Sequence, residues 1–399
     1  MDGRRLHRWI RFGALACTLC MLAAFGTASA SAATLPPQGI FENCNLDTEM
    51  QTCVQRLEVM HQGGMQVVVI QAWGYSLASL SQYAEAAHSL GMSVMWQIAG
   101  PGPFWWQGSS SSTSMSGPFS ALASSCGCDQ NGPLLASTVQ WLSQLPGTYG
   151  YFAADAYDDT VSSGDDSGMA SYVAQIKQQD PTHTVMIGSA DESETSQYQR
   201  IPDEIGTEMY PVTTSSLMPV GANQDMWGSI AQWASDAQRS ADAAGKQSAF
   251  ILQAFTWGDN LVDGQAIGVC SATDTQSSCY AKLRYPSSAE QLQLRNEVLS
   301  NAHPALILWF SFYGTYGQAG DDTYSIYPTG AEAAARWAGL AAAVQGPFPG
   351  APTETHGRPH VASGHKILAH IAGSHAKRHR RRKHRRHRRR LNHRRKKRA

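Results

Sequence analysis

Eight strand-like runs alternate with eight helix-like runs between Gly39 and Gln345. The strand-like runs are apolar, β-branched or aromatic, and they cover residues 39–43, 65–73, 92–100, 149–157, 183–191, 204–212, 248–257 and 305–314. The helix-like runs cover residues 46–61, 76–90, 134–145, 168–179, 196–201, 227–244, 287–302 and 331–344. Strands that alternate with helices predict βαβ units and a parallel sheet. Eight such units predict an α/β fold, a single closed (β/α)8 or TIM barrel, in which functional groups lie at the carboxyl ends of the strands.

The first thirty residues have the composition of a secretory signal peptide. Four arginines precede an apolar stretch at 13–25, and Ala28-Ser29-Ala30 offers a small-residue cleavage site. The apolar stretch is shorter than the ~20 residues that a membrane-spanning helix needs. We therefore expect residues 1–30 to be a removed signal peptide, with no transmembrane segment, and the protein to be secreted, either extracellular or associated with the cell wall.

Charge divides the rest of the chain into an acidic body and a basic tail. Of the 31 Lys and Arg residues, 18 lie from Arg358 onward and 9 lie in residues 31–355, which hold 30 Asp and Glu. The net charge of that body is −21, although the whole chain has a net charge of +0. We expect a barrel domain at 31–346, a Pro/Gly/His linker at 347–376 and a disordered Arg/Lys/His-rich tail at 377–399.

The basic tail predicts binding to polyanions by counterion release, without recognition of a specific nucleic acid. In a secreted protein the available polyanions include anionic polymers of the cell envelope, and we expect the tail to hold the protein there. The alternatives are contact between the tail and the acidic barrel, or a solvated tail without a role.

Six cysteines follow the signal peptide, and an even number in an exported chain predicts disulfides. The expected pairs are near neighbours in the chain: Cys44 with Cys53, Cys270 with Cys279, and Cys126 with Cys128. A metal site is the alternative, but these cysteines lack the partnering histidine or second CxxC of such a site. The sequence predicts neither a metal nor a cofactor.

Two acidic side chains fall near the carboxyl ends of predicted strands. Asp155 shares a face with Tyr151, and Glu208 shares a face with Gly206 and Tyr210, because alternate side chains of a strand point the same way. We expect both carboxyls to point into the barrel mouth. Glycoside hydrolysis needs such a pair, since one carboxyl protonates the leaving oxygen while the other attacks or activates water. The alternative is that these acids cap helices or lie in solvent.

Further side chains at the strand ends predict contacts with a substrate. Asp191 ends the fifth strand and Glu42 lies near the end of the first, so they would add two acids to the mouth. Aromatic rings stack on the apolar faces of sugars, and amides pair with hydroxyl groups. The expected contacts of these two kinds are Trp73, Trp105, Trp106, Tyr157, Tyr210, Trp257 and Trp309, and Gln71, Gln97 and Gln253. The alternative is that many of the aromatics are core residues.

Four segments resemble those of secreted, actinobacterial-looking glycoside-hydrolase-type TIM barrels. They are GYFAAD on the fourth strand, IGTEMYP on the sixth, ILQAFTW on the seventh and ALILWFSFYG on the eighth. Many such barrels end the fourth strand with G-Y-x-x-x-D-E-P and the sixth with D-x-Y-P. The resemblance therefore supports Asp155 and, with Tyr210 and Pro211, Glu208 as site residues.

The chain departs from the pattern of these barrels at two places. Ala156-Tyr157 stands where the resemblance implies Glu-Pro, and Gln253 stands where clan-A glycosidases have a nucleophilic glutamate on the seventh strand. Either Asp155 and Glu208 form the catalytic pair, or the barrel binds sugar without cleaving it.

We therefore expect a secreted, monomeric glycoside hydrolase that cleaves the glycosidic bonds of a polysaccharide or oligosaccharide through paired carboxylates. The alternative from another class is a non-catalytic carbohydrate-binding or cell-wall-associated barrel. Other chemistries find little support, because the chain has no phosphate-binding loop and no G-x-S-x-G nucleophile motif.

Overall fold

The computed structural model describes residues 35–72, 75–98, 132–154, 166–189, 199–212, 226–256, 270–275, 277–278, 282–312, 326 and 331–348. Its helices and strands all belong to the unit formed by Pro36–Ala399. The predicted signal peptide, the tail and the linker beyond residue 348 lie outside the described residues. Within the described ranges, no helix combines the length and the apolar character needed to cross a membrane.

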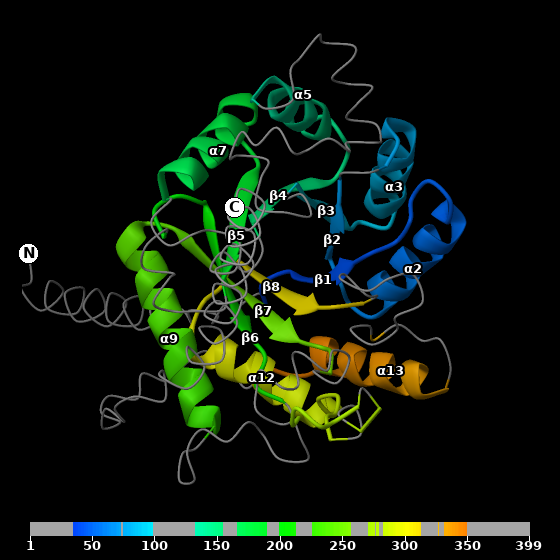
Figure 1. Ribbon diagram of the computed structural model, residues 1–399, viewed down its shortest axis with the longest axis vertical. Coiled ribbons are helices and arrows are strands. Elements are labelled where there is room, and N and C mark those ends of the chain that lie inside the picture. Colours follow the sequence, from blue (N-terminus) through cyan, green and yellow to red (C-terminus); the bar gives the residue numbers. More distant parts are fainter. Residues whose placement is uncertain are drawn as a thin grey trace, which may run out of the picture. The chain divides into compact units, whose positions relative to one another are not determined.

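Eight parallel strands close into one barrel in sequence order (Figure 1). The strands are β1 (Gln38–Glu42), β2 (Val67–Gln71), β3 (Ser93–Gln97), β4 (Thr148–Ala154), β5 (Thr184–Ser189), β6 (Glu204–Met209), β7 (Gln247–Gln253) and β8 (Leu306–Phe310). β1 pairs with both β2 and β8, which closes the ring. The predicted (β/α)8 barrel is confirmed.

Helices follow seven of the eight strands within the described residues, and they lie outside the barrel (Figure 1). They are α2 (Met50–Gln62), α3 (Leu77–Ser89), α5 (Gly132–Leu142), α7 (Asp166–Gln179), α9 (Met226–Ala244), α12 (Ser288–Asn301) and α13 (Ala331–Gln345). The short helix predicted at 196–201 is absent from 199–201, which form a turn and a bend, and 196–198 lie outside the described residues.

The inside of the barrel is filled by aromatic and aliphatic side chains. The ring of Phe41 on β1 lies 5.3 Å from the ring of Phe152 on β4 and 5.2 Å from that of Phe310 on β8. Because β1 and β4 are not neighbours in the sheet, these rings meet across the barrel interior. Residues in register with them face inward, and the alternate residues pack against the helices.

Strand β4 departs from regular alternation at two register shifts, the second of them between Phe152 and Ala154 against β5. Tyr151 and Ala153 belong to the layer between strands and helices, whereas Phe152 faces inward. The expectation that Tyr151 shares an inward face with Asp155 was therefore wrong for Tyr151, since a bulge changes which residues share a face. Asp155 lies outside the described residues, and its direction stays a prediction.

Helix α12 begins with a capping box. The Ser287 hydroxyl accepts the Glu290 amide hydrogen, and the Glu290 carboxylate accepts the Ser287 amide hydrogen at 2.9 Å. The same carboxylate pairs with the Arg284 guanidinium at 2.6 Å. The hydrogen bonds from Arg284 outweigh burial and lower the pKa of Glu290 to about 2, which keeps the cap ionised.

A buried arginine on α12 holds the end of α13. The Arg295 side chain is 0 % exposed, and its guanidinium donates to the carbonyl oxygens of Ala343 at 2.5 Å, Val344 at 2.6 Å, Gly346 at 2.9 Å and Pro347 at 3.1 Å. The last carbonyls of a helix have no partner within the helix. Arg295 therefore terminates α13 and fastens it to α12.

Replacing Arg295 with Met should lower the free energy of unfolding by on the order of 3 kcal/mol, because several carbonyls would lose their partner. Urea unfolding followed by circular dichroism measures the change. Arg239→Met is the matched control: the Arg239 side chain is 68 % exposed and pairs with Asp236, so its loss should cost less than about 0.5 kcal/mol. Equal effects of the two substitutions would contradict this role of Arg295.

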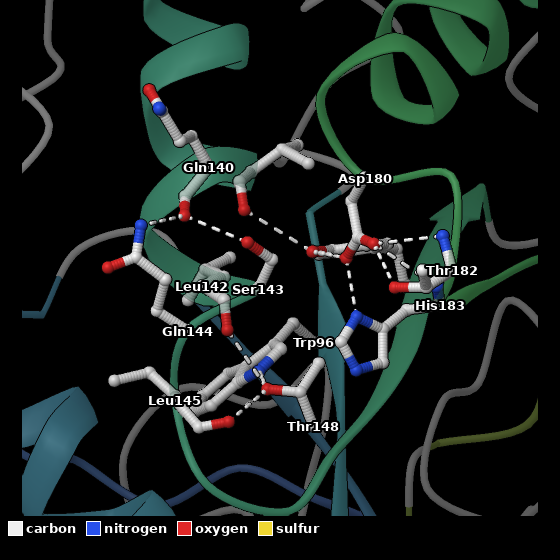
Figure 2. A network of polar contacts seen from close by, with 12 residues as sticks. Trp96, Gln140, Leu142, Ser143, Gln144, Leu145, Thr148, Asp180, Thr182 and His183 are labelled. Carbon is white, nitrogen blue, oxygen red and sulfur yellow. Dashed lines mark hydrogen bonds and ion pairs between the residues drawn. The ribbon is translucent and has the colours of Figure 1, made fainter.

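A second polar network joins the loop before β5 to the outside of β4 (Figure 2). The Asp180 carboxylate accepts from the Tyr151 hydroxyl at 2.7 Å and the Thr182 hydroxyl at 2.7 Å, and contacts Nδ1 of His183 at 2.5 Å. Burial works to raise the pKa of Asp180, but these hydrogen bonds outweigh it and hold the pKa well below its usual range. The network lies at the amino ends of the strands, where side chains serve stability rather than catalysis.

The predicted disulfide between Cys44 and Cys53 is present, with 5.7 Å between the two Cα atoms. It ties the segment after β1 to the first turn of α2. Cys270 is also disulfide-bonded. Cys279, Cys126 and Cys128 lie outside the described residues, so the pairs predicted for them stay predictions.

Candidate functional site

Glu208 lies near the carboxyl end of β6 with its side chain inside the barrel. Glu208 is in register with Ile251, whose side chain belongs to the interior cluster, and only 7 % of Glu208 is exposed. Tyr210, two residues later, packs against the same cluster. The sequence-based expectation that Glu208 and Tyr210 share an inward face therefore agrees with the geometry.

A glycine on the neighbouring strand makes room for the Glu208 carboxyl. A β-carbon on Gly188 would lie 3.1 Å from Cζ of Phe152, 3.3 Å from Cδ1 of Ile251 and 3.5 Å from Oε1 of Glu208. These three side chains therefore converge over the Gly188 backbone. The Glu208 carboxyl therefore lies close to the Phe152 ring and the Ile251 side chain. A larger residue at Gly188 would crowd the carboxyl.

Two amide side chains face the interior at the ends of β2 and β3. Gln71 is in register with Gln97, and Gln97 is in register with the inward-facing Phe152. Both glutamines are half-buried. Each amide has donors and acceptors that suit hydroxyl groups. The geometry thus places Gln71 and Gln97 at the same end of the barrel as Glu208.

Aromatic rings form a continuous contact around the inside of β6, β7 and β8. The Tyr210 ring lies 5.0 Å from that of Phe255, which lies 5.7 Å from that of Phe310. Phe255 is 2 % exposed and Phe310 is 7 % exposed, whereas Tyr210 is half-buried. The two phenylalanines therefore make an apolar floor beside the half-buried Tyr210.

Gln253 ends β7 and is 0 % exposed. Its Oε1 accepts the Val212 amide hydrogen at 2.7 Å, and its Nε2 donates to the Val212 carbonyl at 2.7 Å and the Phe255 carbonyl at 3.1 Å. Both hydrogens of the amide are used by the main chain. The expectation that Gln253 binds substrate is therefore corrected, because this side chain has no donor left for a ligand.

Glu42 was expected in the mouth and lies on the other side of the sheet. It is in register with the outward-facing Ile70, and its Oε1 accepts from Nη1 of Arg56 on α2 at 3.1 Å. Burial raises the pKa of Glu42 to about 7, with the Arg56 guanidinium opposing that rise. Phe41 faces inward, and successive side chains of a strand point to opposite faces, so Glu42 points toward the helices. The expectation that Glu42 contacts substrate is therefore corrected.

Trp309 was expected to contact substrate and is instead a core residue. It is 0 % exposed, and its indole Nε1 donates to Oε1 of Gln38 at 3.1 Å. Its neighbour Phe310 takes the inward position, and a strand alternates faces. Trp309 therefore packs in the layer between the strands and the helices.

A second carboxyl inside the barrel was not identified from the sequence. Glu204 begins β6, is 1 % exposed, and accepts a hydrogen bond from the Tyr149 hydroxyl at 2.8 Å. Burial raises its pKa to about 7, partly opposed by the hydrogen bond from Tyr149. Glu204 shares the inward face of Glu208 by alternation, which is the signal that could have revealed it. It lies four residues earlier in the strand, toward the amino end of the barrel.

The other expected site residues lie outside the described residues: Asp155, Tyr157, Asp191, Trp73, Trp105, Trp106 and Trp257. Their places in the site stay predictions. In the part of the chain that the structure describes, no group of three or more His, Cys, Asp or Glu side chains is placed to hold a metal ion.

The comparisons with known proteins support the fold. No family model and no curated protein matches the sequence. Among solved structures, a GH5_18 protein from Bifidobacterium longum subsp. longum in complex with Manb1-4GlcNAc is similar over 79% of this chain and 80% of its own, with 10% identity and a TM-score of 0.51. An endo-1,4-beta-mannanase from Rhizomucor miehei covers 78% and 95%, with 13% identity and a TM-score of 0.45.

A third similar structure is an endo-beta-1,4-mannanase from Thermotoga petrophila, with 11% identity, 78% and 77% coverage and a TM-score of 0.43. These structural neighbours are glycoside-hydrolase TIM barrels. At such low identity the likeness to the first of them establishes the (β/α)8 fold, and the activity of this chain has to be argued from its own residues.

Proposed function

We propose that the protein is a glycoside hydrolase that cleaves a polysaccharide or oligosaccharide at the carboxyl end of its barrel. The observation that carries this proposal is the inward, nearly buried carboxyl of Glu208 at the end of β6, with Tyr210 beside it and the amides of Gln71 and Gln97 at the same end. Barrels of this type perform their chemistry at that end.

Glu208 needs a second carboxyl, and Asp155 is the proposed partner. Asp155 follows Ala154, the last residue of β4, so both acids come from the carboxyl ends of strands. One would protonate the leaving oxygen while the other attacks the sugar or activates a water. Their separation decides the stereochemistry, because retaining enzymes hold the pair ~5–5.5 Å apart and inverting enzymes ~6.5–9.5 Å apart.

Binding of the sugar would use the amides and the aromatics around this pair. Gln71 and Gln97 suit hydroxyl groups, and the half-buried ring of Tyr210 offers both a face and a hydroxyl. The proposed remainder of the binding surface comes from the segments after the strands: Trp73, Trp105, Trp106, Tyr157, Asp191 and Trp257.

We propose that the protein lies outside the cell. The Cys44–Cys53 disulfide supports an oxidising compartment, where such bonds persist. The signal-like residues 1–30 support export, and the basic residues 377–399 support retention on anionic envelope polymers.

A non-catalytic carbohydrate-binding protein is the second candidate, and one observation favours it. Gln253 stands where the resembling barrels have a nucleophilic glutamate, and its amide is committed to the main chain of Val212 and Phe255. A barrel that lost this acid would keep its fold and could still bind sugar.

Hydrolysis assays on a panel of glycans, with the wild type and an Asp155→Asn variant, separate the two candidates. The wild type should release reducing sugar from at least one glycan, and Asp155→Asn should lower kcat on it by at least about 100-fold, as expected for loss of a proton-transfer group. Binding without turnover, with equal affinity in both proteins, would overturn the hydrolase and support the binding protein.

A further inference from the structure

The hydrogen-bonded ladder between β6 and β7 stops one residue after Glu208 and just before Tyr210. Regular pairing ends with Met209 opposite Leu252. Pro211 comes two residues later and has no amide hydrogen to continue the ladder. The regular pairing therefore lapses at Tyr210 and Pro211, and Val212 beyond them forms only an isolated bridge.

A side chain adds to the pairing beyond this proline. The amide of Gln253 both accepts from the Val212 amide and donates to the Val212 carbonyl, each at 2.7 Å. A third hydrogen bond, to the Phe255 carbonyl at 3.1 Å, fixes the orientation of the amide. The Gln253 amide thus makes the same two hydrogen bonds to Val212, one accepted and one donated, that a main-chain residue of a neighbouring strand would make.

We propose that Gln253 is a positioning residue, whose amide clamps the main chain at Val212 and so holds Tyr210 and Glu208 in place at the barrel mouth. Glu208 is fastened on one side by the β6–β7 ladder and on the other by this clamp four residues later. This inference deepens the proposed glycoside hydrolase function and rests on it for its catalytic consequence.

The packing around the clamp shows what it positions. Tyr210 lies between Glu208 and the clamped Val212, and its ring is held edge-on against Phe255 at 5.0 Å. Phe255 in turn supplies the third carbonyl that the Gln253 amide binds. Loss of the amide would therefore release both the backbone after Tyr210 and the residue that its ring packs on.

The first test is Gln253→Met, which keeps the length of the side chain and removes its hydrogen bonds. Amide hydrogen exchange by mass spectrometry of peptides that span Val212 should show faster exchange by at least about 10-fold. On the glycan that the wild type cleaves, kcat should fall by about 10- to 100-fold with KM within about threefold, because misplacement by ~1 Å is enough for such a loss.

Gln238→Met is the matched control. Gln238 is also a buried glutamine, 6 % exposed, and its amide bonds Ser248 at 2.6 Å, Asp242 at 2.8 Å and the His303 amide at 3.0 Å. It lies on α9, away from the mouth. Its replacement should lower stability but leave kcat and exchange at Val212 unchanged.

A second variant, Gln253→Glu, tests the clamp by pH and does not depend on the folding of Gln253→Met. A protonated glutamic acid at this position can accept from the Val212 amide and donate to its carbonyl, whereas the ionised form would face the carbonyl oxygens of Val212 and Phe255. Relative to wild type, Gln253→Glu should therefore have near-normal kcat at low pH and lose it as the pH rises. A nucleophile restored at this position would give the opposite profile.

The proposal is overturned if Gln253→Met keeps wild-type exchange at Val212, if it loses that protection with kcat unchanged, or if Gln253→Glu gains activity on ionisation. If the wild type cleaves no glycan, the proposed function fails, and exchange at Val212 in the two variants still decides whether the clamp exists.

Discussion

A Glu208→Gln variant is expected to keep the fold and to lose at least about 100-fold in kcat on any glycan that the wild type hydrolyses. Glutamine has nearly the shape of glutamic acid but neither gives nor takes the proton, and it is no nucleophile. General acid–base catalysis contributes ~10²–10⁴-fold, and loss of an essential nucleophile costs at least as much. Steady-state kinetics on the best glycan measure the loss.

A control variant and a second substrate make the result interpretable. Glu58→Gln removes an exposed carboxyl on α2 and should leave kcat unchanged. An aryl glycoside with an acidic phenol leaving group needs no protonation of the leaving oxygen. If Glu208 is the general acid, the variant should therefore recover much of its activity on such a substrate, whereas a lost nucleophile would leave it inactive. Wild-type kcat in Glu208→Gln on every substrate would remove Glu208 from the catalytic pair.

The barrel could be predicted from the sequence because its strands and helices repeat one pattern. Every strand-like run overlaps an observed strand, and the ends differ by a few residues where polar or glycine-containing flanks leave the boundary open. The sequence shows eight strand–helix units, and that number predicts that the sheet closes into a barrel.

The direction of individual side chains was harder to predict, because a single bulge in a strand reverses the face to which the side chains beyond it point. Counting alternate residues from Glu208 worked in β6, which pairs regularly with β7. In β4 the shift between Phe152 and Ala154 separates Asp155 from Tyr151, so a count back from Asp155 does not give the face of Tyr151, which points outward. Glu42 was expected in the mouth because it lies near the end of a strand, but its neighbour Phe41 takes the inward position.

The role of Gln253 could not be read from the sequence either. A glutamine at a strand end suits a sugar hydroxyl and a main-chain peptide equally well. Its real partners depend on where the backbone goes after Pro211, and that path is a property of the folded chain. The buried pair of Tyr149 and Glu204 could not be predicted for a related reason, since the two residues lie 55 positions apart in the chain.

Replacing Glu204 with Gln is expected to stabilise the protein above neutral pH. Burial raises the pKa of Glu204 from 4.5 to about 7. The folded state then binds the proton more tightly than the unfolded state, so stability is greatest below pH 4.5 and falls as the pH rises to about 7, by at most about 1.4 kcal/mol per pH unit. Glutamine resembles the protonated acid and does not titrate, so the variant should gain on the order of 2 kcal/mol at pH 8.

Urea unfolding at pH values from 4 to 8 measures this difference. Wild type and Glu204→Gln should unfold at similar urea concentrations near pH 4 and diverge with rising pH. Glu42, whose pKa burial also raises to about 7, titrates in both proteins, so the variant should keep part of the pH dependence rather than lose it all. Glu58→Gln, at an exposed position, should run parallel to wild type.

A Tyr149→Phe variant tests the same pair from the other side. The Tyr149 hydroxyl donates to Glu204 and so favours the ionised carboxyl, lowering the pKa that burial raises. Without that hydroxyl the pKa of Glu204 should rise further, and the loss of stability should continue to higher pH than in wild type. In the double variant with Glu204→Gln, the loss of stability should no longer continue to higher pH, because neither residue of the pair then titrates. Parallel curves for wild type, Tyr149→Phe and Glu204→Gln would mean that the Glu204 carboxyl is not held protonated inside the barrel.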